Sequence, residues 1–219
     1  MSESEILWWL ALAFTLYALL HSVLAARPCK AAMARCWPRL MPAYRLLYNA
    51  LALLLLLPLL WLLWQWPGEL LWRRPEWLRW LFDGLALAAL LGFLHSLKSY
   101  DLSLFSGTAQ WRRGMVEVDA GEGFQIGFWH RFVRHPWYSF ALVLLWTRDM
   151  NAAQLLFYSL ATLYFVIGSR LEEAKLVAQF GEPYRRYAAR VPGLLPRPWR
   201  YLSAAEAERL LHGDGGAKR

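Results

Sequence analysis

The chain has 219 residues, of which 58% are hydrophobic, 18% are charged and 16% are aromatic, including 14 Trp. Soluble domains normally carry about 25% charged residues, so this composition excludes an ordinary soluble enzyme, and 2 Cys exclude a disulfide scaffold. The formal net charge is +8, but the basic residues lie beside apolar runs, where anionic lipid is a simpler partner than nucleic acid. We therefore expect membrane lipids as partners and no nucleic acid.

Four long apolar runs are the first elements to be located along the chain. Each is close to the roughly 20 residues that span a bilayer as a helix, and they are Ile6–Ala26, Leu46–Trp66, Trp80–Leu97 and Met150–Ser169. The first run follows Glu3 and Glu5 instead of a basic segment, so we expect it to be a spanning helix and not a signal peptide.

The distribution of Lys and Arg predicts the orientation of these helices. The loop after the first run has no acidic residue and five basic ones, Arg27, Lys30, Arg35, Arg39 and Arg45. From Arg170 onward there are ten basic residues against six acidic. Both regions should face the cytoplasm, with the N-terminus on the other side. That arrangement requires a fifth crossing, for which the candidate is His135–Thr147, whose 13 residues span only about 20 Å as a helix.

The sequence thus predicts an all-α polytopic membrane helical bundle with about five transmembrane segments. We expect one domain over residues 1–219, with three spanning helices in 1–97 and a cytoplasmic loop in 98–134. Residues 135–200 should form a C-terminal helical hairpin, and residues 201–219 a mobile tail. After the last span, Glu172–Tyr187 is expected to be an interfacial amphipathic helix, interrupted by Gly181 and Pro183.

Three polar clusters are expected at the cytoplasmic boundary: Arg134–Tyr138, Arg170–Glu173 and Phe180–Tyr187. A hairpin brings its two ends together, so His135 and Tyr138 should lie near Glu172. Pro136 suits the first turn of a helix and leaves neighbouring amides available to an anionic ligand. Taken singly, each cluster also suits an interfacial anchor or a solvated helix end, whereas an ionisable group of this kind is a natural ligand site.

The order and spacing of these clusters carry a resemblance. From Phe124 to Pro196 the chain resembles the isoprenylcysteine carboxyl methyltransferase-like superfamily of integral-membrane methyltransferases. The matching residues are Arg134-His135-Pro136-Trp137-Tyr138, then Glu172-Glu173, then Phe180-Gly181 with Tyr184 and Tyr187, and Val191-Pro192. In the first half, His21-Ser22, Ala26-Arg27-Pro28 and the stretch from Leu94-His95 to Asp101-Leu102 look like the branch with bacterial methanethiol methyltransferases and NnrU-type proteins.

The resemblance implies that S-adenosylmethionine binds in a cytoplasmic cofactor pocket formed by residues 135–200, in a protein of the bacterial inner membrane. His135, Pro136, Trp137 and Tyr138 match the family's cofactor-binding motif, and Glu172 matches the acid that binds the cofactor, through its amino group. Family cofactor contacts also fall at Phe124, Gln125 and His130. The transfer is an in-line displacement that needs correct positioning and no metal.

Two departures from the family pattern bear on the methyl acceptor. Phe140 stands where the motif has Gly, and Gly168 stands where the family has a substrate-binding Arg. The second departure favours a small or hydrophobic thiol over a prenylcysteine carboxylate. A thiol reacts as its thiolate, so the site needs a group that stabilises or generates this anion. By position, the catalytic candidates are Arg170, His21 and His95.

Several alternatives stay open at this point. The acceptor could be the carboxylate of a prenylcysteine-like substrate or a lipid amine. A non-enzymatic alternative is an NnrU-like or haem-binding membrane accessory protein, in which His21 and His95 would ligate haem from neighbouring helices. Buried hydrogen-bonded histidines would explain the same two residues.

Overall fold

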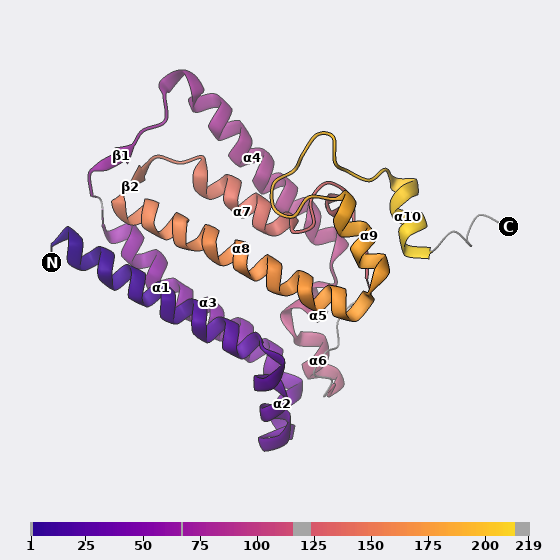
Figure 1. Ribbon diagram of the computed structural model, residues 1–219. Helices are drawn as coiled ribbons and strands as arrows, with labels where there is room; N and C mark the ends of the chain where they lie inside the picture. Colours follow the sequence, from indigo (N-terminus) through magenta and orange to yellow (C-terminus); the bar gives the residue numbers. More distant parts are fainter. Residues whose placement is uncertain (1, 67, 116–123, 213–219) are drawn as a thin grey trace. The chain divides into compact units, whose positions relative to one another are not determined.

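The computed structural model describes residues 2–66, 68–115 and 124–212, and Figure 1 traces their elements along the chain. The chain divides into two compact units, each described here by itself. The first unit comprises residues 1–73, 100–121 and 149–160, and the second comprises 74–99, 122–148 and 161–219. The expected loop 98–134 therefore contributes to both units, and its residues 116–123, which include Glu117, Asp119 and Glu122, lie outside the described part.

In the first unit, α1 (Glu3–Ala25) packs against α3 (Met41–Gln65). A capping box starts α1, because Ser2 and Glu5 satisfy each other's backbone N–H groups. Between the two long helices lie α2 (Arg27–Cys36), with Pro in its first turn, and the 3₁₀ turn η1 (Pro38–Leu40). The buried core includes Phe14, whose ring meets that of Phe157 edge to face at 5.4 Å.

Two short helices, α5 (Leu102–Ser106) and α6 (Thr108–Arg113), also belong to the first unit and pack against α3. Gly107 joins them with a φ of 92°, and a β-carbon there would lie 2.6 Å from the Leu46 backbone, so only glycine fits. The Asn49 side-chain amide donates to the carbonyls of Phe105 and Ser106 and so caps the end of α5. The sequence analysis placed no helix in this stretch.

One feature of the first unit departs from the all-α prediction. Strand β1 (Leu70–Trp72) pairs antiparallel with β2 (Met150–Asn151), just before α8 (Ala152–Phe180). Asn151 and Gln154 exchange side-chain-to-backbone hydrogen bonds of 2.9 Å, which caps α8. The Asn151 amide also donates to the Trp66 carbonyl at 3.0 Å. The segment just before α8 is thus partly extended, because residues distant in sequence supply its hydrogen-bond partners.

In the second unit, α4 (Arg79–Ser96) packs against α7 (Pro136–Trp146). Flanking 3₁₀ turns are η2 (Glu76–Leu78), η3 (Leu97–Ser99) and η4 (Trp129–Arg131). Close packing is possible because α4 has Gly92 at the contact, where a β-carbon would lie 2.8 Å from the Phe140 ring. The Phe140 ring also meets that of Trp129 edge to face at 5.1 Å. Phe140, the departure from the family motif, is therefore accommodated by a glycine on α4.

The C-terminal part of the second unit contains α9 (Glu182–Arg190) and α10 (Ala204–His212), which contact each other. Gly181, with a φ of 62°, separates α8 from α9, so the segment expected over Glu172–Tyr187 is divided between two helices. Tyr184, Tyr187, Val191 and Leu202 form a buried hydrophobic cluster. The prediction of a mobile tail over 201–219 needs correction for residues 201–212, because Leu202 is fully buried and α10 follows it.

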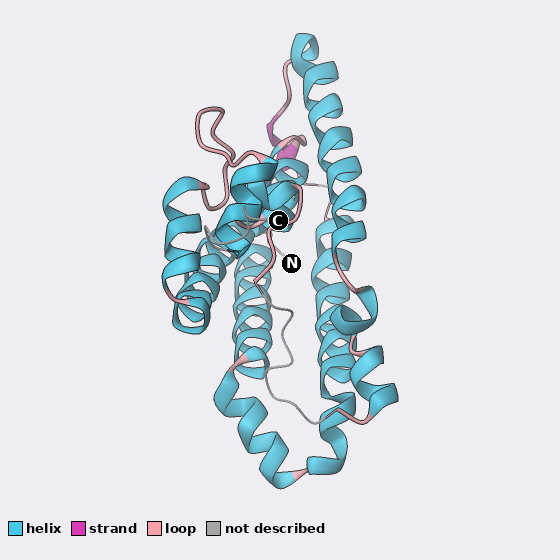
Figure 2. Ribbon diagram, turned by 90° about the vertical axis from the view of Figure 1, so that its right-hand side faces the viewer, coloured by secondary structure: helices cyan, strands magenta, loops and turns pink. Residues whose placement is uncertain are grey.

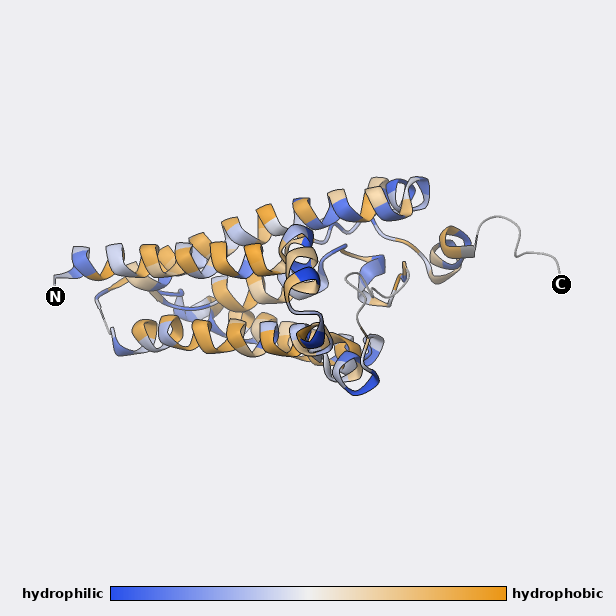
Figure 3. Cartoon of the chain, turned by 90° about the horizontal axis from the view of Figure 1, so that it is seen from below, coloured by the Kyte–Doolittle hydropathy of each residue, from blue (hydrophilic) through white to orange (hydrophobic). Residues whose placement is uncertain are grey.

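Within the described residues, four helical stretches are long and apolar enough to cross a membrane: Glu3–Ala25, Pro38–Gln65, Glu76–Ser99 and Ala152–Phe180. Each of the four predicted apolar runs lies largely in one of them. Figure 2 shows that most of the described chain is helical, and Figure 3 shows that the residues of the long helices are mainly hydrophobic. The chain is an α-helical integral membrane protein. The fifth predicted segment corresponds to α7, which has only 11 residues.

Candidate active site

The site begins where the chain enters α7 in the second unit. The backbone N–H groups of Arg134 and His135 donate to the carbonyls of Pro192 and Gly193 at 2.8 and 3.1 Å. One turn later the Ser139 hydroxyl donates to the Leu194 carbonyl. We call residues 192–194 the strap. These three hydrogen bonds hold the strap against the start of α7, so α7 starts inside the protein and not in solvent.

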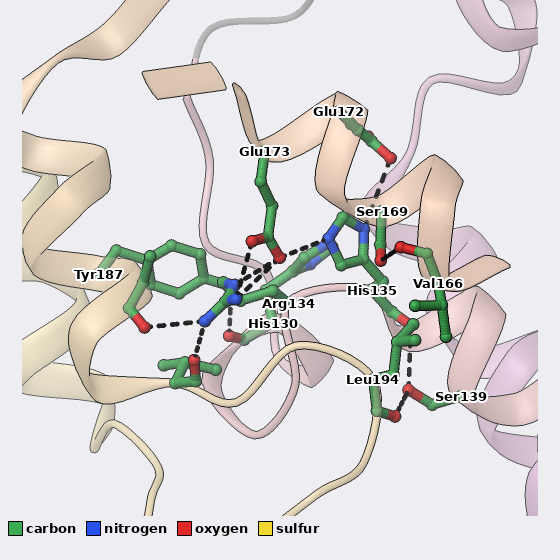
Figure 4. A network of polar contacts seen from close by, with 12 residues as sticks. His130, Arg134, His135, Ser139, Val166, Ser169, Glu172, Glu173, Tyr187 and Leu194 are labelled. Atoms are coloured by element: carbon green, nitrogen blue, oxygen red, sulfur yellow. Dashed lines mark hydrogen bonds and ion pairs between the residues drawn. The ribbon is translucent and has the colours of Figure 1, made fainter. Parts of the chain in front are cut away.

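Arg134 and Glu173 form the most extensively bonded ion pair of the site (Figure 4). The guanidinium Nε and Nη2 atoms donate to the two carboxylate oxygens of Glu173, each at 2.9 Å. Its Nη1 atom donates to the carbonyls of Ala188, at 2.8 Å, and Val191. The side chains are 14% and 22% exposed, so water screens the pair only partly. Arg134 thereby connects α8, the end of α9 and the start of the strap.

His135 lies between the carboxylates of Glu172 and Glu173, two consecutive residues of α8. Its Nε2 donates to Glu173 Oε1 at 3.0 Å, and its Nδ1 lies 3.5 Å from Glu172 Oε2. Its side chain is 6% exposed, whereas that of Glu172 is 51% exposed. Burial by itself lowers the pKa of His135, but the hydrogen bonds to Glu172 and Glu173 and their negative charges outweigh it, so the pKa is raised overall. The expected proximity of His135 and Glu172 is present.

His130 lies nearby, and its pKa is shifted in the opposite direction. The Tyr187 hydroxyl donates to the His130 carbonyl at 2.7 Å, which fixes η4 against α9. Burial and the neighbouring charge of His135 lower the pKa of His130 to about 4. Its imidazole is therefore neutral at pH 7, while His135 beside the glutamates favours the charged form.

Tyr138 lies one turn beyond His135 on α7. Its ring stacks on that of His135 at 5.5 Å and on that of Phe165 at 4.9 Å, with interplanar angles of 12° and 9°. Its hydroxyl approaches Gly168, where a β-carbon would lie 3.9 Å away. Tyr138 therefore lies against the face of α8 that carries Gly168 and Glu172.

The other residues expected to bind the cofactor have different surroundings. Trp137 turns toward α4, where its indole N–H donates to Ser96 Oγ at 2.8 Å. Phe124 packs on Phe180, Tyr184 and Tyr187 beside the hydrophobic cluster, and Gln125 is exposed. Pro136 is buried in the first turn of α7. The structure thus brings His130, His135, Tyr138 and Glu172 together, while Phe124 and Trp137 make packing contacts.

The three catalytic candidates are divided between the two units. His95 is exposed and accepts a hydrogen bond from the Trp129 indole at 3.1 Å, and Arg170 is exposed and forms no ion pair with any described residue. Both belong to the second unit. His21 belongs to the first unit, where its Nε2 lies 2.7 Å from the Tyr48 hydroxyl. Among the described residues, no group of three or more His, Cys, Asp or Glu could hold a metal ion.

The sequence analysis did not assign a role to several residues that build the site. Arg134 and Glu173 flank the predicted residues in the motifs, so their adjacency was a usable signal. Ser139 and Tyr187 act through backbone carbonyls of the strap and η4. Carbonyl partners leave no trace in residue type, so sequence patterns could not reveal these two contacts.

Comparison with known proteins places this site in a family. No protein-family model and no solved structure matches the chain. It is 34% identical over 197 residues to a methanethiol S-methyltransferase of Pseudomonas sp., covering 85% of this chain and 72% of the relative. It is 34% identical to methanethiol S-methyltransferase 2 of Bradyrhizobium diazoefficiens (85% and 71% covered). It is 32% identical to the Mycobacterium tuberculosis protein of the same activity name (84% and 76% covered). With the fold and the cluster around His135, these similarities show that the chain belongs to the methanethiol S-methyltransferase family, a branch of the isoprenylcysteine carboxyl methyltransferase-like membrane proteins.

Proposed function

We propose that this protein is a membrane methyltransferase that transfers a methyl group from S-adenosylmethionine to methanethiol or another small thiol. The observation that carries the proposal is the buried His135, held between Glu172 and Glu173 at the open end of a helical hairpin, where the start of α7 meets α8. It lies in a chain about one-third identical to methanethiol S-methyltransferases over 85% of its length. Cofactor, substrate and sidedness are parts of this proposal.

The residues around His135 fit S-adenosylmethionine. Its methionine part carries an ammonium and a carboxylate, for which a half-exposed Glu172 and the uncapped first turn of α7 are complementary partners. When bound, the cofactor supplies a methyl group on a cationic sulfonium, which a thiolate takes by in-line displacement with release of the neutral thioether. The chain's own residues act by position: Arg134 and Glu173 hold His135, and His135 orients the Glu172 carboxylate.

Formation of the thiolate is the second task of the site. The thiol of free cysteine has a pKa of about 8.5 and a simple alkanethiol is a weaker acid, so a cation or a hydrogen-bond donor near the sulfur would increase the reactive fraction at neutral pH. Arg170 and His95 in the second unit are proposed for this role, together with His21 in the first unit. Exposure leaves Arg170 and His95 accessible, whereas His21 is already close to the Tyr48 hydroxyl.

We further propose that the site faces the cytoplasm of the bacterial inner membrane and that α7 forms a fifth, partial crossing. As a helix, 11 residues reach about 17 Å, less than the hydrocarbon core of about 30 Å. Burial of Pro136 and the strap bonds to Arg134 and His135 allow α7 to start below the membrane surface. The basic loop after α1 and the basic C-terminal region support the same sidedness.

The test uses the full-length protein purified in lipid nanodiscs. With S-adenosylmethionine and methanethiol, we expect dimethyl sulfide in the headspace and binding of S-adenosylhomocysteine by calorimetry. Glu172→Gln should weaken that binding at least tenfold, while Glu208→Gln, at an exposed position of α10, should leave it unchanged.

Absence of both binding and thiol turnover would refute the proposal. Turnover of a prenylcysteine analogue or a lipid amine without turnover of any thiol would replace the acceptor. A Soret band removed by His21→Ala or His95→Ala would favour the haem-binding alternative.

A further inference from the structure

Two helix faces meet on the hairpin next to the carboxylates. On α8, Phe165, Gly168 and Glu172 are spaced three and four residues apart, which places them on one face of the helix. On α7, His135 and Tyr138 are three apart. His135 contacts Glu172, and Tyr138 stacks on Phe165. Gly168 therefore lies between two contacts that join the same pair of faces.

Nothing in the described packing requires a glycine at position 168. Positive φ values occur among the described glycines at Gly107, Gly114 and Gly181, so Gly168 has an ordinary helical backbone. A β-carbon there would have one atom within 4 Å, the Tyr138 hydroxyl oxygen at 3.9 Å. Glycine inside a helix costs about 1 kcal/mol relative to alanine. The chain therefore carries an unfavourable residue where a larger one would fit, and the result is open space beside Tyr138.

The Tyr138 hydroxyl lies beside this space, its position is fixed, and it is available as a hydrogen-bond donor. Its ring is fixed on both faces by His135 and Phe165. Within the described part of the chain, the hydroxyl has no hydrogen-bond partner. A phenol can donate one hydrogen bond, and a donor near a sulfur anion favours the ionised form of a thiol.

From these contacts, and resting on the proposed function, we infer that Gly168 determines the size of the methyl acceptor and that the Tyr138 hydroxyl donates a hydrogen bond to its sulfur. A small thiol occupies the volume that a side chain at position 168 would fill. A longer alkyl chain must pass Gly168. A methyl group added at position 168 would therefore clash with that alkyl chain and not with other side chains of the protein.

The experiment compares a series of alkanethiols from methanethiol to butanethiol as acceptors for the full-length protein in nanodiscs. Gly168→Ala should lower kcat/KM for butanethiol relative to methanethiol by about tenfold, within the range of discrimination expected for one carbon in an apolar site. Gly84→Ala is the matched control, because Gly84 is an exposed helical glycine with no atom within 4 Å of its β-carbon position. It should leave all ratios unchanged.

The hydroxyl has a separate readout. Tyr138→Phe keeps the stacked ring and removes the donor. The pH at which the rate with methanethiol rises should therefore be higher in this variant than in the wild type. An unchanged pH profile would overturn the role of Tyr138. Equal loss for all thiols in Gly168→Ala, or loss of S-adenosylhomocysteine binding by this variant, would overturn the role of Gly168. If the wild type turns over no thiol at all, the proposed function itself fails instead.

Discussion

Replacing Glu173 by Gln tests whether the Arg134–Glu173 pair holds the site together. The substitution keeps the size of the side chain but removes its charge. It weakens two hydrogen bonds of 2.9 Å to Arg134 and one of 3.0 Å to His135. It also leaves a guanidinium that is only 14% exposed without its counter-ion. Charge-assisted hydrogen bonds contribute about 1.5–3 kcal/mol each, and breaking a buried pair costs about 3–5 kcal/mol.

Glu173 is 22% exposed, and the Arg134 bonds to the Ala188 and Val191 carbonyls remain in the variant. We therefore expect a loss of stability below the full cost of breaking a buried pair. Glu173→Gln should reduce the free energy of unfolding by about 2–4 kcal/mol. Unfolding by SDS in mixed micelles, followed by far-ultraviolet circular dichroism, measures it. Glu208→Gln serves as the exposed control.

A double-mutant cycle separates this pair from general damage. Arg134→Met, Glu173→Gln and the double variant should give a coupling energy of about 1.5–3 kcal/mol. A coupling below about 0.5 kcal/mol, typical of independent sites, would show that the bidentate geometry does not stabilise the protein, and the reasoning would be refuted.

Three further predictions concern pH, packing and topology. The raised pKa of His135 means that its charged form stabilises the fold below about pH 6.5. This contribution disappears as the pH rises through the folded-state pKa. Unfolding experiments at pH 6 and pH 9 should therefore show a loss of stability at the higher pH in the wild type and not in His135→Gln. Gly92→Val should displace the Phe140 ring, which lies 2.8 Å from the β-carbon position, and lower the free energy of unfolding by about 1–3 kcal/mol, so an unaffected unfolding midpoint would contradict the packing of α4 on α7. Reporter fusions after Ala26 and after His212 should both report a cytoplasmic location, and disagreement between the two would mean that α7 does not cross.

The sequence by itself determined the class of protein and the location of its four long helices, although α3 begins before the predicted Leu46 and α8 continues past the predicted Ser169 to Phe180. Apolar runs near 20 residues are decided by the thickness of the hydrocarbon layer, so the four long candidate spans follow from composition alone. The hairpin also follows, because two consecutive apolar segments joined by a short connection run antiparallel and bring their outer ends together. That reasoning is enough to place His135 next to Glu172.

Sequence reasoning was weaker where the partner is a backbone group or a distant glycine. The strand β2 exists because Leu70 and Trp72 supply its partners, and the strap is held through the carbonyls of Pro192 and Gly193. Backbone groups are common to all residues, so no residue pattern marks such contacts. The same limit applies to residues 201–212, which were predicted to belong to a mobile tail although Leu202 is buried and α10 follows it.

Only the tertiary structure decided what each motif residue does. Trp137 and Tyr138 are neighbours in the cofactor motif, yet a helix turns successive residues by about 100°, so Trp137 meets Ser96 on α4 while Tyr138 faces α8. Phe140 stands where the family motif has Gly, and its ring packs on Gly92 of α4. Motif spacing gives the order of functional groups, whereas the direction of each side chain depends on which helix packs against which face, and that is decided by long-range contacts.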